Sequence, residues 1–343
     1  LGAYRNYYIN SLFAWFRAYS NFFNKSIFED YPQAKKQSLM EIWSSLPIYY
    51  SPNYCTHGNT RWNTHWYLLD ILSREDRAYV YNYLKKVKEF EKVLPYSRTF
   101  GYPSSLFMYS WKRNFSDIIP QNPPYSSYLS NESIFKVFRQ NWNKDSLWLS
   151  LITYKPEHFY KSDSNRNMMH NDQLSVEFFA KGDLLLADGG EVKCVLDRQY
   201  GSPVFMHNVL LIENPRSPYY NELYDTYAQG IAKWKRENSI VKEMILSTKQ
   251  IDIVEAGLRI EYVTPGREVY GVEKLSSPIE YERIVIFPKS YFVIIDRAKS
   301  NETWIWRNLW RFSSLNIVPS GDLNGDGKFN TSDVNDIGHV INL

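Results

Sequence analysis

The fold of this chain is decided between residues 170 and 208. The sequence there reads His170-Asn171-Asp172-Gln173-Leu174-Ser175-Val176-Glu177-Phe178-Phe179, then Leu184-Leu185-Leu186-Ala187-Asp188-Gly189-Gly190, and then Met206-His207-Asn208-Val209-Leu210-Leu211. The apolar runs are short and rich in β-formers, which predicts neighbouring strands of a packed sheet. Two histidines and an aspartate flank these runs, and rigid strands can bring such side chains together although they are distant in sequence.

These flanking residues match the ligands that zinc prefers. Zinc binds neutral imidazole nitrogens and carboxylate oxygens and leaves a fourth position for water. One interpretation of His170, Asp188 and His207 is therefore a zinc site. The alternative is that the three side chains are satisfied separately at strand ends, because no short-spaced His-x-x-x-His pair accompanies them. Spacing alone leaves both interpretations open.

Several motifs resemble the heparinase II/III-like family of polysaccharide lyases. The central ones are His-x-Asp-Gln-Leu-Ser-x-Glu from His170, Leu-Leu-x-Asp-Gly-Gly up to Gly190, and His-Asn-x-Leu-Leu from His207. Upstream, residues 135–142 resemble a strand of that family that carries Arg-x-x-Trp, and residues 282–288 and 291–297 resemble its late strand pair. The resemblance covers residues 130 to 315 well and the first 110 residues loosely.

The resemblance implies an α+β multidomain chain. Its expected parts are helices of a partial α/α toroid over residues 1–95, a linker and edge segment over 96–130, and an antiparallel β-sandwich over 131–318. It also implies zinc on His170, Asp188 and His207, where the metal braces the sandwich face that closes a cleft.

Periodicity predicts the same order of elements. Tyr8, Leu12, Phe16 and Tyr19 recur at helical spacing, as do Tyr79, Tyr83, Val87, Phe90 and Leu94, and Ser73 with Asp76 resembles a capping box. Later runs predict strands, separated by turn residues as in an antiparallel sandwich. They are residues 147–152, 174–179, 209–212, 251–254, 258–263, 284–287 and 291–295, with room for a helical insertion in 222–246.

Composition and charge limit the classes of partner that we expect this protein to bind. The net charge of +3 favours no polyelectrolyte, so we expect no nucleic-acid partner. No apolar run reaches the roughly 18 residues of a membrane span, and we expect no membrane association. Tyrosine and tryptophan are abundant, which suits both core packing and sugar stacking. Cys55 and Cys194 are far apart and form no CxxC motif, and a secreted protein could join them.

A polar segment in the helical half is a candidate substrate cleft. It reads Cys55-Thr56-His57-Gly58-Asn59-Thr60-Arg61-Trp62-Asn63-Thr64-His65-Trp66. Arginine pairs with carboxylates and tryptophan stacks on rings, whereas the plainer interpretation is a polar loop between helices. The family carries an Asn/His pair on its toroid, which Asn63 and His65 match best, with His57 and Asn59 as the alternative. Its catalytic tyrosine corresponds to Tyr102 or Tyr109, although packing is the commoner role of a tyrosine.

The C-terminal residues form a separate signal. The pattern of residues 322–333 matches a calcium loop, in which oxygen ligands come from Asp322, Asn324, Asp326, the Lys328 carbonyl and Asp333. With a helix expected after it, the segment 319–343 resembles one dockerin repeat of the usual two. This predicts Ca²⁺ binding and an extracellular, secreted protein, with a cohesin-type partner as a candidate.

Together these features predict a polysaccharide lyase that cleaves a uronic-acid glycan by β-elimination. Asn63 and a histidine would neutralise the uronate carboxylate, and a tyrosine and a histidine would transfer the protons. Some relatives have a histidine where this chain has Met168, whose thioether cannot serve as acid or base. The alternatives are a zinc-stabilised, non-catalytic glycan-binding protein and a glycoside hydrolase, although no motif pairs Glu29, Asp30 and Asp70 as hydrolysis requires.

Overall fold

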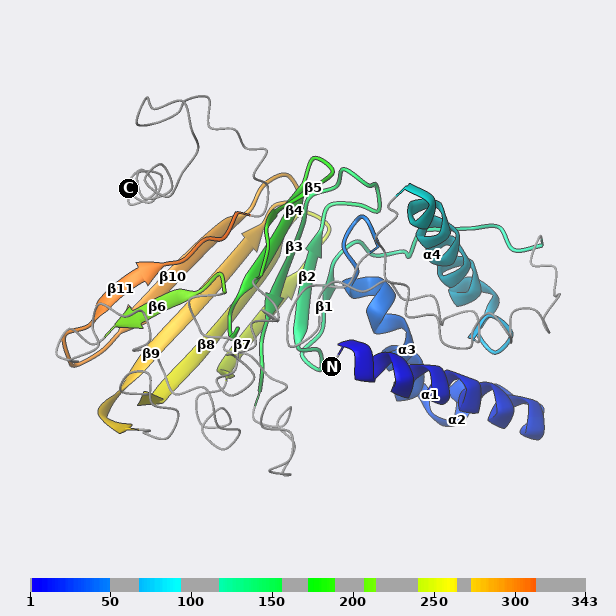
Figure 1. Ribbon diagram of the computed structural model, residues 1–343, viewed down its shortest axis with the longest axis horizontal. Coiled ribbons are helices and arrows are strands. Elements are labelled where there is room, and N and C mark those ends of the chain that lie inside the picture. Colours follow the sequence, from blue (N-terminus) through cyan, green and yellow to red (C-terminus); the bar gives the residue numbers. More distant parts are fainter. Residues whose placement is uncertain are drawn as a thin grey trace.

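The computed structural model describes residues 2–49, 68–93, 117–155, 172–188, 207–213, 240–263 and 273–312. Helices occupy the first part of this chain, and strands occupy the part from residue 128 onward. The helices are α1 (Gly2–Phe23), α2 (Ile27–Asp30), α3 (Pro32–Ser44) and α4 (Arg74–Val93). They gather on one side of the strands, next to β1 and β2 (Figure 1). The expected mixture of α and β structure with antiparallel sheets is confirmed.

Local sequence signals set the ends and faces of the helices. The Ser73 hydroxyl oxygen accepts a hydrogen bond from the Asp76 backbone N–H at 3.1 Å and donates one to the Asp76 carboxylate at 2.7 Å, which caps α4 as predicted. Tyr79, Tyr83 and Val87 are buried on one face of α4, which confirms the helical spacing. Tyr83 and Val87 belong to a helical core that also contains the buried phenylalanines of α1.

The strands form three antiparallel sheets. One sheet has the order β1-β2-β3-β4-β5, a second β10-β9-β8-β7, and a two-stranded sheet pairs β11 with β6. The first contains β1 (Tyr128–Leu129), β2 (Phe135–Arg139), β3 (Trp148–Ile152), β4 (Val176–Ala180) and β5 (Asp183–Leu186). The others contain β6 (Leu210–Glu213), β7 (Ile240–Ser247), β8 (Asp252–Val263), β9 (Glu273–Phe287), β10 (Val293–Lys299) and β11 (Ile305–Asn308).

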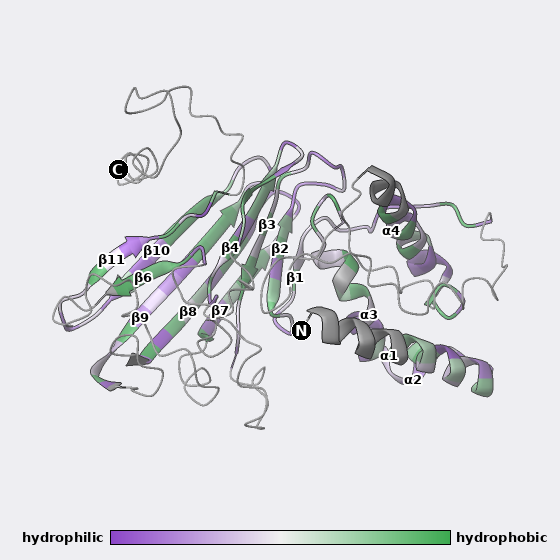
Figure 2. Ribbon diagram, in the orientation of Figure 1, coloured by the Kyte–Doolittle hydropathy of each residue, from purple (hydrophilic) through white to green (hydrophobic). Residues whose placement is uncertain are grey.

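One strand prediction and the last part of the predicted helical insertion differ from the structure. Residues 251–254 and 258–263 were expected to form separate strands, but both belong to the single strand β8, because Gly257 continues the ladder opposite Glu282. Residues 240–246 lie in β7 and are not helical, since they pair with β8 along their length. The remainder of the expected insertion, residues 222–239, lies outside the described residues. Hydrophobic and hydrophilic residues are mixed along β8 and β9 (Figure 2).

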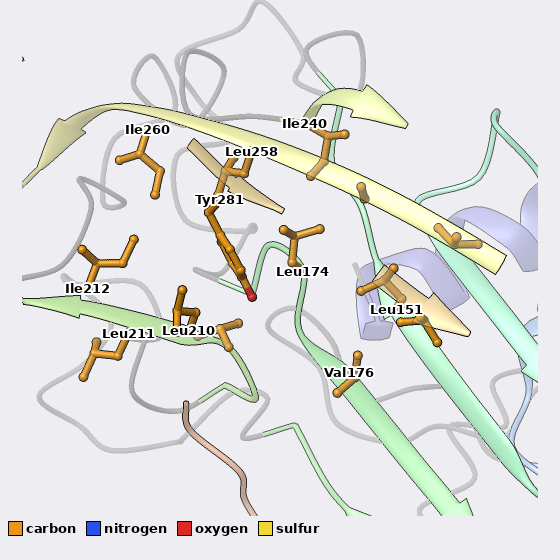
Figure 3. Close-up of a cluster of buried hydrophobic side chains, with 14 of the residues drawn as sticks. Leu151, Leu174, Val176, Leu210, Leu211, Ile212, Ile240, Leu258, Ile260 and Tyr281 are labelled. Atoms are coloured by element: carbon orange, nitrogen blue, oxygen red, sulfur yellow. The ribbon is translucent and has the colours of Figure 1, made fainter. Parts of the chain in front are cut away.

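The central strands of the five-stranded sheet are buried on both faces. Every residue of β2 and β3 is buried. One face contributes to the sandwich core against the four-stranded sheet, and Tyr281 extends from β9 into this cluster toward Leu174 and Leu210 (Figure 3). The other face forms a second cluster, which includes Leu46 and Ile48 from the helical part of the chain. The sheet is therefore the middle layer between the helical part and the four-stranded sheet.

A buried arginine joins the helical part to this middle sheet. Arg139, at the end of β2, donates from Nη2 to the carbonyl oxygens of Trp43 and Ser45 at 3.1 and 2.5 Å. These carbonyls lie at the C-terminal end of α3, where backbone oxygens have no helical partner and a cation is favourable. The guanidinium also lies 3.9 Å from the Trp142 ring centroid. The Arg-x-x-Trp pattern thus fixes the end of α3 against the sheet.

We expect Arg139→Met to lower the free energy of unfolding by about 3 kcal/mol, because two buried carbonyls lose a charged donor. Urea denaturation would measure the change. Arg259→Met is the matched control, since its side chain is 48% exposed and pairs with Glu261, and it should change stability by less than about 0.5 kcal/mol. Equal effects of the two substitutions would contradict a joining role for Arg139.

A second buried cation lies inside the sandwich. Lys136 of β2 is fully buried, and its ammonium group lies 3.0 Å from the Glu243 carboxylate of β7. It also donates to Thr153 Oγ1 at 2.8 Å, and Lys155 approaches the other oxygen of Glu243 at 2.9 Å. Burial lowers the pKa of Lys136 to about 8, although the negative charge of Glu243 acts in the opposite direction. The folded protein therefore releases this proton more readily than the unfolded chain does.

This lowered pKa predicts a pH dependence of stability. Between pH 8 and about 10.5 the unfolded chain still holds the Lys136 proton that the folded protein has lost, so the Lys136 contribution to stability rises with pH across that window. Across the whole window, this effect raises the free energy of unfolding by about 3 kcal/mol. Urea denaturation of the wild type and Lys136→Met across this range should show a difference that changes with pH. A constant difference would contradict the prediction.

Candidate functional site

Two of the three predicted zinc ligands meet in the structure. Asp188 lies just after β5, and His207 lies three residues before β6. Both residues are buried, with exposed fractions of 2% and 0%. His207 Nδ1 lies 2.8 and 2.9 Å from the two Asp188 carboxylate oxygens. The five-stranded and two-stranded sheets thus bring together an imidazole and a carboxylate that are 19 positions apart in sequence.

Ser175 completes this cluster from the start of β4. Its hydroxyl donates to Asp188 Oδ2 at 2.6 Å and accepts from the Asn208 backbone N–H at 3.0 Å. Both the serine and the histidine therefore contact the carboxylate. In a Ser-His-Asp triad the imidazole lies between the other two groups. The cluster consequently has the connections of a fixed polar centre and not those of a nucleophilic triad.

The side chain of Asn208 holds the surrounding backbone segments together. Its amide nitrogen donates to the carbonyls of Val176 and Ala187 at 2.8 and 3.0 Å, and its oxygen accepts from the Arg311 backbone N–H at 2.6 Å. One amide thereby connects β4, the residue before Asp188, and the segment after β11. Burial lowers the pKa of the Arg311 side chain, whereas the negative charge of Asp188 acts to raise it.

The donor set suits a zinc ion. A carboxylate and an imidazole face each other in a buried position, and both are common zinc ligands. Two ligands at zinc distances and a tetrahedral angle lie roughly 3.3 Å apart, so a metal would separate this pair by about half an ångström. The third predicted ligand, His170, lies outside the described residues. Within the described ranges no three histidine, cysteine or acidic side chains cluster in a way that could hold a metal.

The other predicted site residues also lie outside the described residues. These are the cleft candidates His57, Asn59, Arg61, Asn63 and His65, the tyrosines Tyr102 and Tyr109, both cysteines, Met168, and the calcium ligands Asp322, Asn324, Asp326, Lys328 and Asp333. Their roles stay predictions. In the described part of the chain, no helix is long and apolar enough to cross a membrane.

Two of the three carboxylates considered for hydrolysis have basic partners. Asp30 accepts from the Tyr19 hydroxyl at 2.9 Å and pairs with Lys25 at 2.6 Å, and Asp70 lies 3.1 Å from Arg17. A surface pocket of about 550 Å³ on the helical part includes Glu29 and Asp70 in its lining. The hydrogen bonds from Lys25 and Tyr19 hold the pKa of Asp30 below its usual value, whereas a glycosidase needs one protonated carboxylic acid.

For some residues in and around this centre, the sequence patterns predicted no role. Ser175 and Asn208 belong to the quoted motifs, but their contacts depend on segments 13 to 33 positions away. Arg283 is a third case. It is a charged residue next to the apolar run 284–287, a position that needs a buried partner. That local conflict is the sequence signal that could have identified it.

Comparison with solved structures relates this fold to heparinases. A heparinase III gene product with methylated lysines matches with a TM-score of 0.50 and 15% identity, over 87% of this chain and 37% of its own length. A further heparinase III matches with a TM-score of 0.48 and 14% identity, over 87% and 40%. A heparan sulfate lyase from Pedobacter heparinus matches with a TM-score of 0.44 and 18% identity, over 80% and 34%.

The match with a TM-score of 0.50 shows a likeness of fold. The chain is a mixed α and β protein with antiparallel sheets, and its fold resembles that of heparinase III. It spans less than half the length of the heparinases that it matches. No protein-family model matches the sequence, and no curated protein matches it.

We expect Ser175→Ala to lower the free energy of unfolding by about 1–3 kcal/mol, because the buried Asn208 N–H and the Asp188 carboxylate each lose a hydrogen-bond partner. Urea denaturation would measure it. Ser290→Ala, at an exposed position between β9 and β10, is the control and should change stability by less than about 0.5 kcal/mol. A Ser175→Ala protein as stable as this control would refute the role assigned to the hydroxyl.

Proposed function

We propose that this chain is a polysaccharide lyase that acts on a uronic-acid glycan by β-elimination. The observation that carries the proposal is the fold likeness to heparinase III with a TM-score of 0.50 across 87% of the chain. A shared fold can host several functions. The buried Asp188–His207 pair adds support, because it lies where the sequence motifs predict a metal centre.

The proposed reaction breaks the C5–H and C4–O4 bonds of the substrate and forms a C4=C5 double bond and an O4–H bond. A base removes the C5 proton of the uronate, a double bond forms between C4 and C5, and the C4–O4 bond breaks as an acid protonates the leaving oxygen. The C5 proton is weakly acidic, so donors must first stabilise the charge that develops on the carboxylate. We assign that role to Asn63 with His65, or to Asn59 with His57. We assign proton transfer to one of these histidines and to Tyr102 or Tyr109.

We assign the zinc ion to His170, Asp188 and His207 as a structural brace. When bound, it would supply positive charge that fixes the carboxylate and the imidazole. The contacts of Ser175 and Asn208 support a structural role, because they bind the surrounding backbone from several segments. Outer-shell contacts of this kind orient metal ligands.

The C-terminal residues 319–343 support a further proposal about the location and the partners of this protein. We propose that Asp322, Asn324, Asp326, Lys328 and Asp333 bind Ca²⁺ as a dockerin-like repeat, and that the protein is extracellular. A cohesin-type partner would then bind through this segment. Calcium loops of this type use closely spaced carboxylate and carbonyl oxygens, and the sequence supplies them.

The deciding experiment is an ultraviolet assay for unsaturated uronate. Purified protein with zinc and calcium would be tested against heparan sulfate, hyaluronan, chondroitin sulfate, alginate and ulvan. We expect absorbance to grow on one of them, and Asn63→Ala and Tyr→Phe substitutions at 102 and 109 to separate the roles. Loss of a catalytic acid or base should lower kcat about 10²- to 10⁴-fold.

Two other results would redirect the assignment. New reducing ends without unsaturated products would overturn elimination in favour of hydrolysis. If folded, zinc-loaded protein binds one of these glycans in affinity chromatography but cleaves none of them, the result would favour the alternative of a non-catalytic glycan-binding protein.

A further inference from the structure

Arg283 of β9 is a fully buried cation that reaches the Asp188–His207 centre from the opposite sheet. Its Nε and Nη2 atoms donate to the two Asp296 carboxylate oxygens at 2.8 and 2.9 Å, in the bidentate geometry that arginine favours. Asp296 also accepts from the Tyr281 hydroxyl at 3.0 Å. The guanidinium is therefore fixed in orientation by neighbours within its own sheet.

The remaining nitrogen of this guanidinium points away from its own sheet. Nη1 donates to the carbonyl oxygens of Leu174 and Asn208, each at 2.6 Å. Leu174 directly precedes Ser175, and Asn208 directly follows His207. A single nitrogen thus connects the two backbone segments that carry the serine and the histidine of the centre. These carbonyls lie 109 and 75 positions from Arg283 in the sequence.

The backbone at one of these anchors is strained. Leu174 has a φ of +63°, the left-handed region that non-glycine residues seldom adopt and that costs about 1–2 kcal/mol. Such a conformation persists where surrounding contacts enforce it. The carbonyl of Leu174 is held by Arg283, and its N–H donates to the Ile152 carbonyl at 3.0 Å. The strained residue turns the chain just before Ser175.

We propose that Arg283 is the positioning residue of the Asp188–His207 centre, which it holds in place through the Leu174 and Asn208 carbonyls. The ion pair with Asp296 orients the guanidinium, and the two carbonyl contacts transmit that orientation across the sandwich. A lysine at this position would keep the charge but lose the planar fork, and so it could not make all four contacts. One of the tests below measures zinc affinity, and in that respect the inference rests on the zinc site of the proposed function.

The test compares Arg283→Lys with Arg139→Lys. Both residues are buried arginines that donate to two backbone carbonyls, but those of Arg139 belong to α3 and not to the centre. Zinc affinity would be measured by chelator competition on full-length protein, with urea denaturation as the folding check. We expect Arg283→Lys to weaken zinc binding by about 10- to 100-fold and Arg139→Lys to leave it within about twofold. Equal effects, or none from Arg283→Lys, would overturn the proposal.

A second variant covers the case in which Arg283→Lys does not fold. Asp296→Asn keeps the guanidinium but removes half of the charge-assisted pair that orients it, so it should weaken zinc binding in the same direction. Unchanged zinc affinity in a folded Asp296→Asn protein would overturn the proposed transmission from Asp296 to the centre.

Failure of the zinc assignment can be told apart from failure of this inference. If the wild type binds no zinc, the same proteins would be compared by NMR for exchange of the His207 imidazole proton with water, assigned with His207→Gln. Arg283→Lys should release the backbone segment that carries His207, so the imidazole proton should exchange at least about tenfold faster than in the wild type. An unchanged exchange rate would overturn the inference. The lyase assay is independent of both readouts, because neither uses a glycan.

Discussion

Burial of the central strands β2, β3 and β4 on both faces of the five-stranded sheet is the constraint on which the rest of this structure depends. The helical part covers one face and the four-stranded sheet covers the other, so polar side chains on either face lie away from water. A buried charge needs an opposite charge or several strong hydrogen bonds to replace the water that it loses. Arg139, Lys136 and Arg283 meet that requirement in three different ways, and each connects the middle sheet to another part of the molecule.

The three cations differ in what they connect. Arg139 binds the open carbonyls at the end of α3 and so joins helices to strands. Lys136 faces a carboxylate across the sandwich interior. Arg283 uses a carboxylate of its own sheet as a support and reaches two carbonyls of the opposite side. Buried ion pairs add little net stability by themselves, but removing one partner is destabilising. They act here mainly by specifying how the layers pack.

The same constraint explains why several hydrogen bonds hold the side chains of the Asp188–His207 centre. Its residues lie at strand ends, where regular ladder hydrogen bonds stop and side chains must satisfy the backbone. Asn208 and Ser175 serve that need and hold the carboxylate and the imidazole within hydrogen-bonding distance. Fixed ligands lose little freedom when a metal binds, which favours affinity. The arrangement agrees with a bracing role for zinc.

The sequence by itself determined the local features of this protein. The helical spacing of Tyr79, Tyr83 and Val87 and the Ser73 cap predicted α4, because both signals act within a few residues. The apolar runs predicted most of the strands, since alternation and length are local properties. The sequence also supplied a carboxylate at Asp188 and an imidazole at His207, within motifs that resemble those of one family. The division of β8 into two strands was wrong, because strand continuity at Gly257 depends on its neighbours in the sheet.

Only the tertiary structure decided which distant groups meet. The contacts of Arg283 span 109 and 75 positions, and the Asn208 amide joins segments that no local pattern relates. Such pairings follow from strand register and from how two sheets face each other, and a change of one residue in register would move each side chain to the opposite face. The sequence therefore supplied the chemistry of the centre, while the packing of the sheets decided its geometry.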